Sequence, residues 1–213
     1  ERSRRNLGVD CIDLMQFHVW EDSWTDDPSW QDAMADLKAR GHIHGLGISI
    51  NRWEPWNALK VLPTGLIDAV QVIYNIFDQA PEDALLPLCR SLDLGVIARV
   101  PFDEGTLTGT LSRDTTWPEG DWRNSYFVPE NLEASVAHAE RLGPLVPEGM
   151  TMAELALRFI LANRDVHTII PGMRSSHHVR SNTATSDGRA LPPDLVAALR
   201  DHRWDREPTA WSQ

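Results

Sequence analysis

Five short apolar segments, separated by amphipathic helices and loops, constrain this chain more than any other feature. The predicted strands are Ile12–His18, His44–Ile50, Asp68–Tyr74, Gly95–Val100 and Val166–Ile170. The predicted helices are Trp30–Arg40, Pro55–Val61, Asp83–Leu92, Asn131–Leu142, Met152–Asn163, Ser176–Thr185 and Pro193–His202. Buried strands that alternate with helices form parallel sheets covered by helices. We therefore predict an α/β fold, in which five units fit a (β/α)8 TIM barrel that lacks three units.

Two of the predicted helices carry clear start signals. Asp27 is the expected N-cap of one, with Pro28 at its first helical position, and Thr151 with Glu154 forms a capping box for another. No turn between a strand and a helix reads G-x-G-x-x-G, which disfavours a doubly wound dinucleotide-binding fold.

Length and charge limit the possible partners. A chain of 213 residues can bury enough surface for one domain, so residues 1–213 are predicted to form one. A net charge of −11 disfavours nucleic acid and anionic membranes as partners. Cys11 and Cys89 lie in apolar segments and are predicted to be buried free thiols, which fits a reducing compartment and a cytoplasmic protein.

Polar residues gather at the ends of the first three predicted strands. In a parallel barrel the carboxyl ends of the strands form the active face, so His18, which ends the first predicted strand, is the first candidate for chemistry. Strand alternation turns Ser49 and Asn51 toward the barrel interior. Gln71 fits a satisfied core amide and a ligand for a planar amide equally well. The opposite face of the second strand is predicted to meet the helices through Leu46, Ile48 and Ile50.

Five motifs in the same order resemble those of the aldo-keto reductase superfamily. The resemblance covers almost the whole chain and identifies its units with barrel strands 4–8. The matching segments are Asp13–His18 (the strand of the catalytic His), Gly45–Ser49 ("IGVS"), Val70–Asn75 ("VQVEYN"), Gly105–Gly109 ("GLLTG") and Ile170–Ser175 with Asn182 ("IPGTRS…EN").

The resemblance implies an NADPH-dependent oxidoreductase that reduces aldehydes or ketones. His18 would polarise the substrate carbonyl. Ser49 and Gln71 would hold the nicotinamide carboxamide, with Asn51 as a substitute one position beyond the family's Asn. Arg99 stands where the family often stacks an aromatic residue on the nicotinamide. There it would weaken NADP+ relative to NADPH, or pair with an acidic substrate group or Asp103.

The resemblance also assigns the far end of the cofactor to the last strand and its helix. A helix N-terminus beside a guanidinium binds phosphate, so Arg174 is the candidate for the 2′-phosphate of the adenosine. Asn182 would contact the adenine edge. The remaining predicted cofactor residues are Gly172, Met173 and His178, although His177-His178 alone fits an exposed surface pair.

A long loop, residues 103–130, follows the fourth strand and is predicted to close over the substrate. Its aromatic residues and Arg123 favour an apolar carbonyl compound, with or without an anionic group, as the small-molecule substrate. The residues expected to line that site are Trp20, Trp117, Trp122 and Tyr126.

One departure from the family bears on activity. Its catalytic Asp, Tyr and Lys precede the His strand, and nothing here matches their motifs; Tyr74 and Tyr126 are the only tyrosines. The chain therefore resembles the C-terminal two-thirds of such an enzyme, and by itself it is expected to be inactive. One alternative is a non-catalytic NADP(H)-binding subunit of the same fold. Another is a metal-dependent hydrolase barrel using His42 and His44, although this pair precedes its strand and no metal ligands are assigned.

Overall fold

The chain is described by a computed structural model over residues 1–209. It divides into two units, and the boundaries between them fall within the strands Gly95–Arg99 and Thr168–Ile170. Unit 1 comprises Glu1–Ile73, Ala80–Ile97 and Asp165–Thr168, and unit 2 comprises Tyr74–Gln79, Ala98–Arg164 and the described residues from Ile169 onward.

A sheet with the strands in chain order runs through unit 1. The strands follow one another across the sheet in the order β1-β2-β3-β4-β5. The β1/β2 and β2/β3 pairs are parallel. The predicted strands are confirmed, with bounds that differ by at most two residues. The strands are β1 (Ile12–His18), β2 (Ile43–Ser49), β3 (Ala69–Ile73), β4 (Gly95–Arg99) and β5 (Thr168–Ile170).

Three helices accompany these strands in unit 1. The Asp27 carboxylate caps the second of them by accepting the Ser29 N–H at 2.9 Å, with Pro28 at the first helical position as predicted. The helices are α1 (Arg2–Leu7), α2 (Pro28–Ala39) and α3 (Leu85–Ser91), with short 3-10 turns η1 (Asp22–Asp26), η2 (Leu62–Thr64) and η3 (Ala80–Glu82).

The predicted helix Pro55–Val61 is wrong, because this segment forms successive turns. The N–H of Asn57 donates to the Glu54 carbonyl and that of Val61 to the Ala58 carbonyl, so the bonds span three residues. The Asn57 amide also binds the loop after β1, donating to the Trp20 carbonyl at 3.0 Å and accepting the Asp22 N–H at 2.7 Å. Tertiary hydrogen bonds thus replace the local helix.

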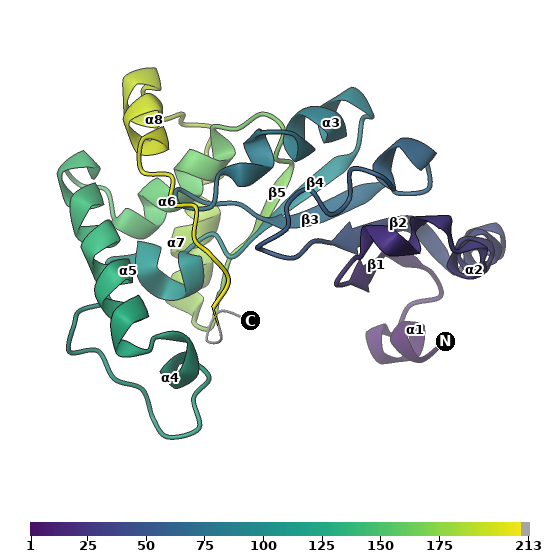
Figure 1. Cartoon of the computed structure of the whole chain (residues 1–213), viewed down its shortest axis with the longest axis horizontal. Coiled ribbons are helices and arrows are strands. Elements are labelled where there is room, and N and C mark those ends of the chain that lie inside the picture. The colour runs from purple at the N-terminus through teal and green to yellow at the C-terminus, as the bar shows by residue number, and fades with distance from the viewer. Residues whose placement is uncertain (210–213) are drawn as a thin grey trace. The chain divides into compact units, whose positions relative to one another are not determined.

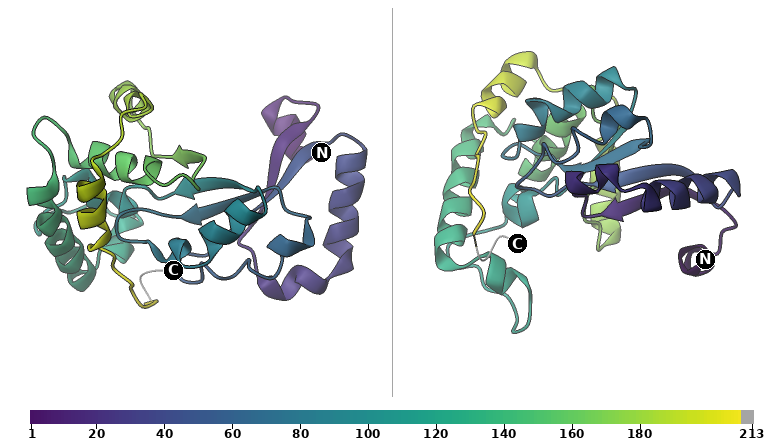
Figure 2. Two further views of the ribbon diagram at one scale, coloured as in Figure 1. Left: turned by 90° about the horizontal axis from the view of Figure 1, so that it is seen from above. Right: turned by 45° about the vertical axis from the view of Figure 1, so that its right-hand side comes forward.

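Unit 2 is mostly helical, and its helices are the green and yellow ones in Figure 1 and Figure 2. Thr151 caps α6 as predicted, accepting the Glu154 N–H at 3.1 Å. The Glu154 carboxylate, however, binds Nε of Arg158 at 2.8 Å. The elements are η4 (Asp103–Thr108), α4 (Arg123–Tyr126), α5 (Pro129–Leu142), η5 (Gly143–Leu145), α6 (Met152–Leu161), α7 (Ser176–Ala184) and α8 (Pro193–Arg200).

The branched residues of β2 are buried, as predicted for the face that meets the helices, although Gly47 and Ser49 on the other face are buried as well. Leu46, Ile48 and Ile50 belong to the core, and all three are at most 2% exposed. The two cysteines are free: Cys89 is buried, while Cys11, which we expected to be buried, is half-buried. Burial raises the pKa of the Cys89 thiol to about 11. Among residues 1–209, no helix combines the length and apolar character needed to cross a membrane.

Candidate functional site

One group of candidate residues lies within unit 1, at the carboxyl ends of β1 and β2 and in the middle of β3. Strand register places His18 opposite Ser49 and Ser49 opposite Gln71. Register partners of parallel strands stand side by side on one face of the sheet. The three residues that the sequence singled out are therefore at one level of the sheet. His18 is exposed, Gln71 is half-buried and Ser49 is buried.

Two glutamines and a serine form a chain of polar contacts on this face. Nε2 of Gln16 lies 3.5 Å from Oε1 of Gln71, and Nε2 of Gln71 lies 3.4 Å from Oγ of Ser49. Both distances are at the long limit for a hydrogen bond. The buried Oε1 of Gln16 has no hydrogen-bond partner among the described residues. These side chains therefore retain capacity for a planar amide ligand.

Gln16 was not among the predicted site residues, although a signal was present. Gln16 precedes His18 by two positions, so strand alternation turns both to the same face. It is also a polar residue within a mostly apolar strand.

Because Gly47 has no side chain, the side chain of Gln16 can reach across β2 toward Gln71. A Cβ at position 47 would lie 2.9 Å from Cγ of Gln16 and 3.1 Å from the Ala69 carbonyl oxygen. Any side chain here would push Gln16 away from Gln71. The glycine is thus part of the polar chain's architecture.

Asn51 has a local partner in the structure. Its Oδ1 accepts the Trp53 N–H at 3.0 Å, an Asx-type turn that starts the segment after β2. The oxygen that would receive a nicotinamide amide is thus bound to the backbone. The predicted role of Asn51 would require this turn to open.

A cavity of about 1050 Å³ lies within unit 2. It brings together four of the predicted cofactor residues and one predicted substrate residue, whereas Arg99 and Met173 are not in its lining. Met173 is 43% exposed, and Arg99 is half-buried at the end of β4. The predicted residues that line it are Gly172, Arg174, His178, Asn182 and Trp122.

The start of α7 forms one wall of this cavity. Oγ of Ser175 caps the helix by accepting the His178 N–H at 3.2 Å, and Nδ2 of Asn182 donates to the Gly172 carbonyl at 3.3 Å. These bonds tie the segment before α7 to the helix itself. A capped helix N-terminus with a nearby guanidinium is a suitable anion site.

Arg174 differs from the other arginines of the cavity because its interaction with a carboxylate, Asp121, is one of charge alone, without an ion pair or hydrogen bond. Arg123 binds Asp121, and both Arg158 and Arg189 bind Asp187. Arg174 has no ion pair or hydrogen bond among residues 1–209. An exposed, unpaired guanidinium at a helix start is available for an anionic ligand.

The loop 103–130 contributes Asp121, Trp122 and Arg123 to the same cavity. The Arg123 guanidinium donates to Asp121 at 2.6 and 2.9 Å. This hydrogen bonding, with a smaller contribution from the charge of Arg174, lowers the pKa of Asp121 to about 2. Asp121 is therefore ionised at neutral pH and sets a negative charge near Arg174.

Three predicted substrate-site aromatic residues pack against their own units. Trp20 is fully buried among Phe17, Trp24 and Trp30 of unit 1, so the prediction that it lines a site is wrong in this structure. Trp117 stacks on Phe127 at 5.1 Å, next to the buried Tyr126. Large aromatic rings bury most area per residue, which favours core packing over exposure.

The alternative of a metal site finds no support in the geometry. Nδ1 of His42 lies 2.7 Å from an Arg4 guanidinium nitrogen, an unfavourable neighbour for a bound cation. Within the described part of the chain, no cluster of His, Cys, Asp or Glu side chains is suited to hold a metal ion.

Comparison with known proteins agrees with the motifs. The model of the "Aldo/keto reductase family" matches residues 1–203. The chain belongs to the aldo/keto reductase family. Its relatives include the NADH-specific methylglyoxal reductase of Escherichia coli, 33% identical over 85% of this chain and 56% of that protein. Another is the aldo-keto reductase yakc [NADP(+)] of Schizosaccharomyces pombe, 27% identical over 84% of this chain and 54% of that protein.

Solved structures show the same family. The holo form of aldo-keto reductase AKR11C1 from Bacillus halodurans matches with a TM-score of 0.73 and 25% identity, over 99% of this chain and 65% of that one. The glycerol dehydrogenase AKR11B4 of Gluconobacter oxydans matches with a TM-score of 0.77 and 26% identity, over 98% and 64%. The chain spans less than two-thirds of the length of these relatives.

Proposed function

We propose that this aldo/keto reductase chain takes part in the NADPH-dependent reduction of an aldehyde or ketone to an alcohol. The observation that carries the proposal is the alignment of His18 and Ser49, at the carboxyl ends of β1 and β2, with Gln71 on the adjacent parallel strand β3. That edge is where catalytic residues lie in barrels of this kind. The five strands then correspond to strands 4–8 of a (β/α)8 barrel.

The described residues fit a nicotinamide cofactor. In unit 1, the partly satisfied amides of Gln16 and Gln71 beside the Ser49 hydroxyl suit a carboxamide, which both donates and accepts. In unit 2, the unpaired Arg174 and the α7 N-terminus suit a phosphate, and Asn182 suits a purine edge. When bound, the cofactor supplies the hydride that reduces the carbonyl carbon.

His18 acts on the substrate through an imidazole N–H. Donation of this N–H to the carbonyl oxygen would orient the substrate and stabilise the negative charge that develops on oxygen. Ser49 and Gln71 would fix the orientation of the carboxamide and thereby the ring face that is presented. Each of these side chains is held by a strand, which limits its movement.

The preference for NADPH rests on Arg174. A guanidinium recognises a phosphate dianion by charge and by paired donors, and this one has no ion pair or hydrogen bond within residues 1–209. The two relatives are named for different cofactors, NADH in the Escherichia coli protein and NADP(+) in the Schizosaccharomyces pombe protein. The proposed preference for NADPH therefore rests on Arg174 and not on the name of either relative.

Titration with NADPH and NADH, followed by the fluorescence of the reduced nicotinamide, tests the proposal. We expect saturable binding of NADPH by the complete protein, weaker binding of NADH, and NADPH oxidation on addition of a small aldehyde. Binding of neither nucleotide would overturn the proposal. Binding of NADPH without oxidation of it by any aldehyde or ketone would favour the non-catalytic NADP(H)-binding subunit.

A further inference from the structure

A strained segment follows β4 in unit 2 and lines the large cavity. Val100, Asp103 and Glu104 have φ values of 53°, 46° and 57°, the left-handed region that residues with a Cβ seldom adopt. Such conformations persist where surrounding contacts enforce them. Five residues of this segment line the cavity: Val100, Pro101, Phe102, Glu104 and Gly105.

A buried ion-pair cluster holds one end of this segment. The Arg206 guanidinium donates to both carboxylate oxygens of Asp103, at 2.9 and 3.2 Å. One of its nitrogens also lies 3.0 Å from both oxygens of Asp78. The side chain of Asp103 is fully buried and that of Arg206 is 4% exposed. Solvent therefore screens these contacts weakly.

The same cluster reaches the other end of the segment. Nδ2 of Asn75 donates to Asp78 at 2.8 Å and to the Val100 carbonyl at 3.0 Å. Arg206 is thus connected to Asp103 directly and to Val100 through Asp78 and Asn75. The two ends of the strained segment are held by one hydrogen-bonded group.

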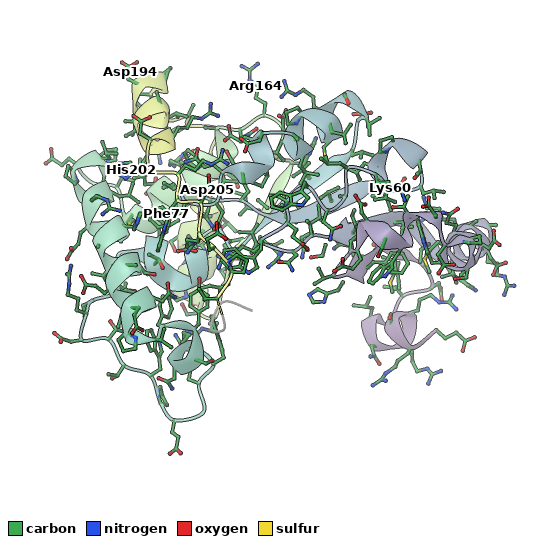
Figure 3. The ribbon with its side chains drawn as sticks, viewed as in Figure 1. Lys60, Phe77, Arg164, Asp194, His202 and Asp205 are labelled. Atoms are coloured by element: carbon green, nitrogen blue, oxygen red, sulfur yellow. The ribbon has the colours of Figure 1, made fainter. Side chains whose placement is uncertain are left out.

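The C-terminal segment that carries Arg206 is itself anchored in unit 2. The Trp204 N–H donates to the Phe77 carbonyl at 2.9 Å, and the Trp204 indole stacks on His138 at 3.8 Å with 6° between the planes. The Arg206 guanidinium lies 4.4 Å above the Trp204 ring. Figure 3 labels Phe77 beside the chain around His202 and Asp205, in agreement with this hydrogen bond.

We propose that Arg206 is a positioning residue for the cofactor cavity. By binding Asp103 and Asp78 it keeps the segment Val100–Gly105 in the strained shape that lines the cavity, so that dinucleotide affinity depends on the C-terminal segment. The consequence for affinity rests on the proposed function of this cavity. A cavity wall that is correctly shaped in only a tenth of the molecules weakens binding about tenfold.

Three variants of the complete protein test this role. Arg206→Lys keeps the charge but lacks the planar fork that spans two carboxylates. The double variant Arg206→Met with Asp103→Asn removes both charges and leaves no buried carboxylate unpaired in that contact. Arg113→Met is the matched control, because Arg113 also joins two carboxylates of unit 2, Glu133 and Glu140, but lies outside this cavity.

Hydrogen exchange of the amides in residues 100–108 and the Kd of NADPH are measured together, with denaturant midpoints as the test of global folding. We expect at least tenfold faster exchange in this segment and an about tenfold higher Kd in both Arg206 variants, with neither change in Arg113→Met. Unchanged segment exchange would overturn the positioning role, whether or not the nucleotide binds. Faster exchange with an unchanged Kd would overturn the link to the cofactor. A wild-type protein that binds no dinucleotide refutes the proposed function and that link, while the exchange data still decide the positioning role.

Discussion

The role proposed for His18 depends on the two polar residues that lie beside it on the adjacent strands β2 and β3. One imidazole at a strand end is common, but this one is in register with the Ser49 hydroxyl, which is in register with the Gln71 amide. Gln16 adds a second amide on the same face. In the proposed reaction, His18 would donate to the substrate carbonyl, while Ser49 and Gln71 would hold the nicotinamide carboxamide at the same level of the sheet.

Replacement of His18 by Ala in the complete protein should lower kcat for carbonyl reduction about 10²-fold or more, because one polarising donor is lost. The Kd for NADPH should change little, since the imidazole is assigned to the substrate. Stopped-flow or steady-state rates with fluorescence titration measure both quantities. His44→Ala, an exposed histidine near the start of β2, is the matched control and should behave as the wild type. An unchanged kcat would make His18 a packing residue.

Replacement of Arg174 by Ala should weaken NADPH binding by about 1.5–3 kcal/mol, the scale of a hydrogen bond to a charged group. NADH, which lacks the 2′-phosphate, should bind almost as before. The control is Arg180→Ala, which removes an exposed arginine of α7 that is not in the cavity lining. Equal losses for the two nucleotides in Arg174→Ala would show that the guanidinium does not read the 2′-phosphate.

At the scale of elements, the polar contacts across β2 depend on Gly47, which has no side chain to block them. Gly47→Ala would place a Cβ 2.9 Å from Cγ of Gln16, so either Gln16 or the strand must move. We expect a loss of about 1–3 kcal/mol in the free energy of unfolding, the range for overpacking, together with weaker nicotinamide binding. Denaturant titration measures the stability.

Gly95→Ala, at the first residue of β4, is the control for that change. A Cβ there would lie 3.5 Å from Cβ of Ala69 and 3.6 Å from the Asp68 carbonyl oxygen, which is ordinary van der Waals contact. Alanine is therefore tolerated and should be neutral or slightly stabilising. If Gly47→Ala were equally neutral, Gln16 would not need the space over β2.

The sequence was sufficient for the strands and for the capped helices. Apolar runs ending at His18 and Ile170 set the strand positions, and Asp27 and Thr151 marked helix starts by local chemistry that needs no tertiary context. The failure at Pro55–Val61 has a tertiary cause, because the Asn57 amide binds the loop after β1. The burial of Trp20 was equally inaccessible, since it depends on rings from three separate segments.

Other parts of the site were beyond any sequence pattern. Arg206 and Asp78 are 128 residues apart, and no spacing rule links them. The unpaired state of Arg174 is visible only once the partners of Arg123, Arg158 and Arg189 are known. Pairwise contacts of this kind come from the fold, whereas motifs report only residue types in order.

At the scale of the whole molecule, His138 makes stability depend on pH. Burial, helped by the nearby Arg141 and Arg206, lowers the pKa of His138 to about 4 from the ordinary 6.5. Between these values the unfolded chain takes up a proton that the native protein does not. Stability is therefore full above pH 6.5 and falls as the pH drops toward 4. His202, whose pKa burial also lowers, acts in the same direction.

His138→Phe should flatten the dependence of the unfolding midpoint on pH between 6.5 and 4, because it keeps the ring stacked on Trp204 and removes the proton site. Thermal or denaturant unfolding across this range is the measurement. Asp121, whose pKa is lowered from 3.8 to about 2 in the native protein, also reduces stability as the pH falls below about 5, but it does so equally in the variant and in the wild type. His44→Phe, which replaces an exposed histidine, is the control and should keep the wild-type dependence of the unfolding midpoint on pH. A slope unaltered by His138→Phe would assign the effect to other groups.

The two tyrosines decide what residues 1–213 can do as an isolated chain. Tyr74 is fully buried, stacks on Phe159 and accepts a hydrogen bond from Asn163 at 3.1 Å, and Tyr126 is 6% exposed beside Phe127. Both side chains are thus enclosed within unit 2, which disfavours either hydroxyl as a proton donor to a substrate. Expressed alone, residues 1–213 should therefore oxidise no NADPH with simple aldehydes, while the complete protein should. Absorbance at the reduced-nicotinamide band, with Tyr74→Phe and Tyr126→Phe as further samples, makes the comparison. An isolated chain that reduces an aldehyde, and loses this activity in one of the two variants, would identify that tyrosine as the acid and refute the proposal that the proton comes from outside these residues.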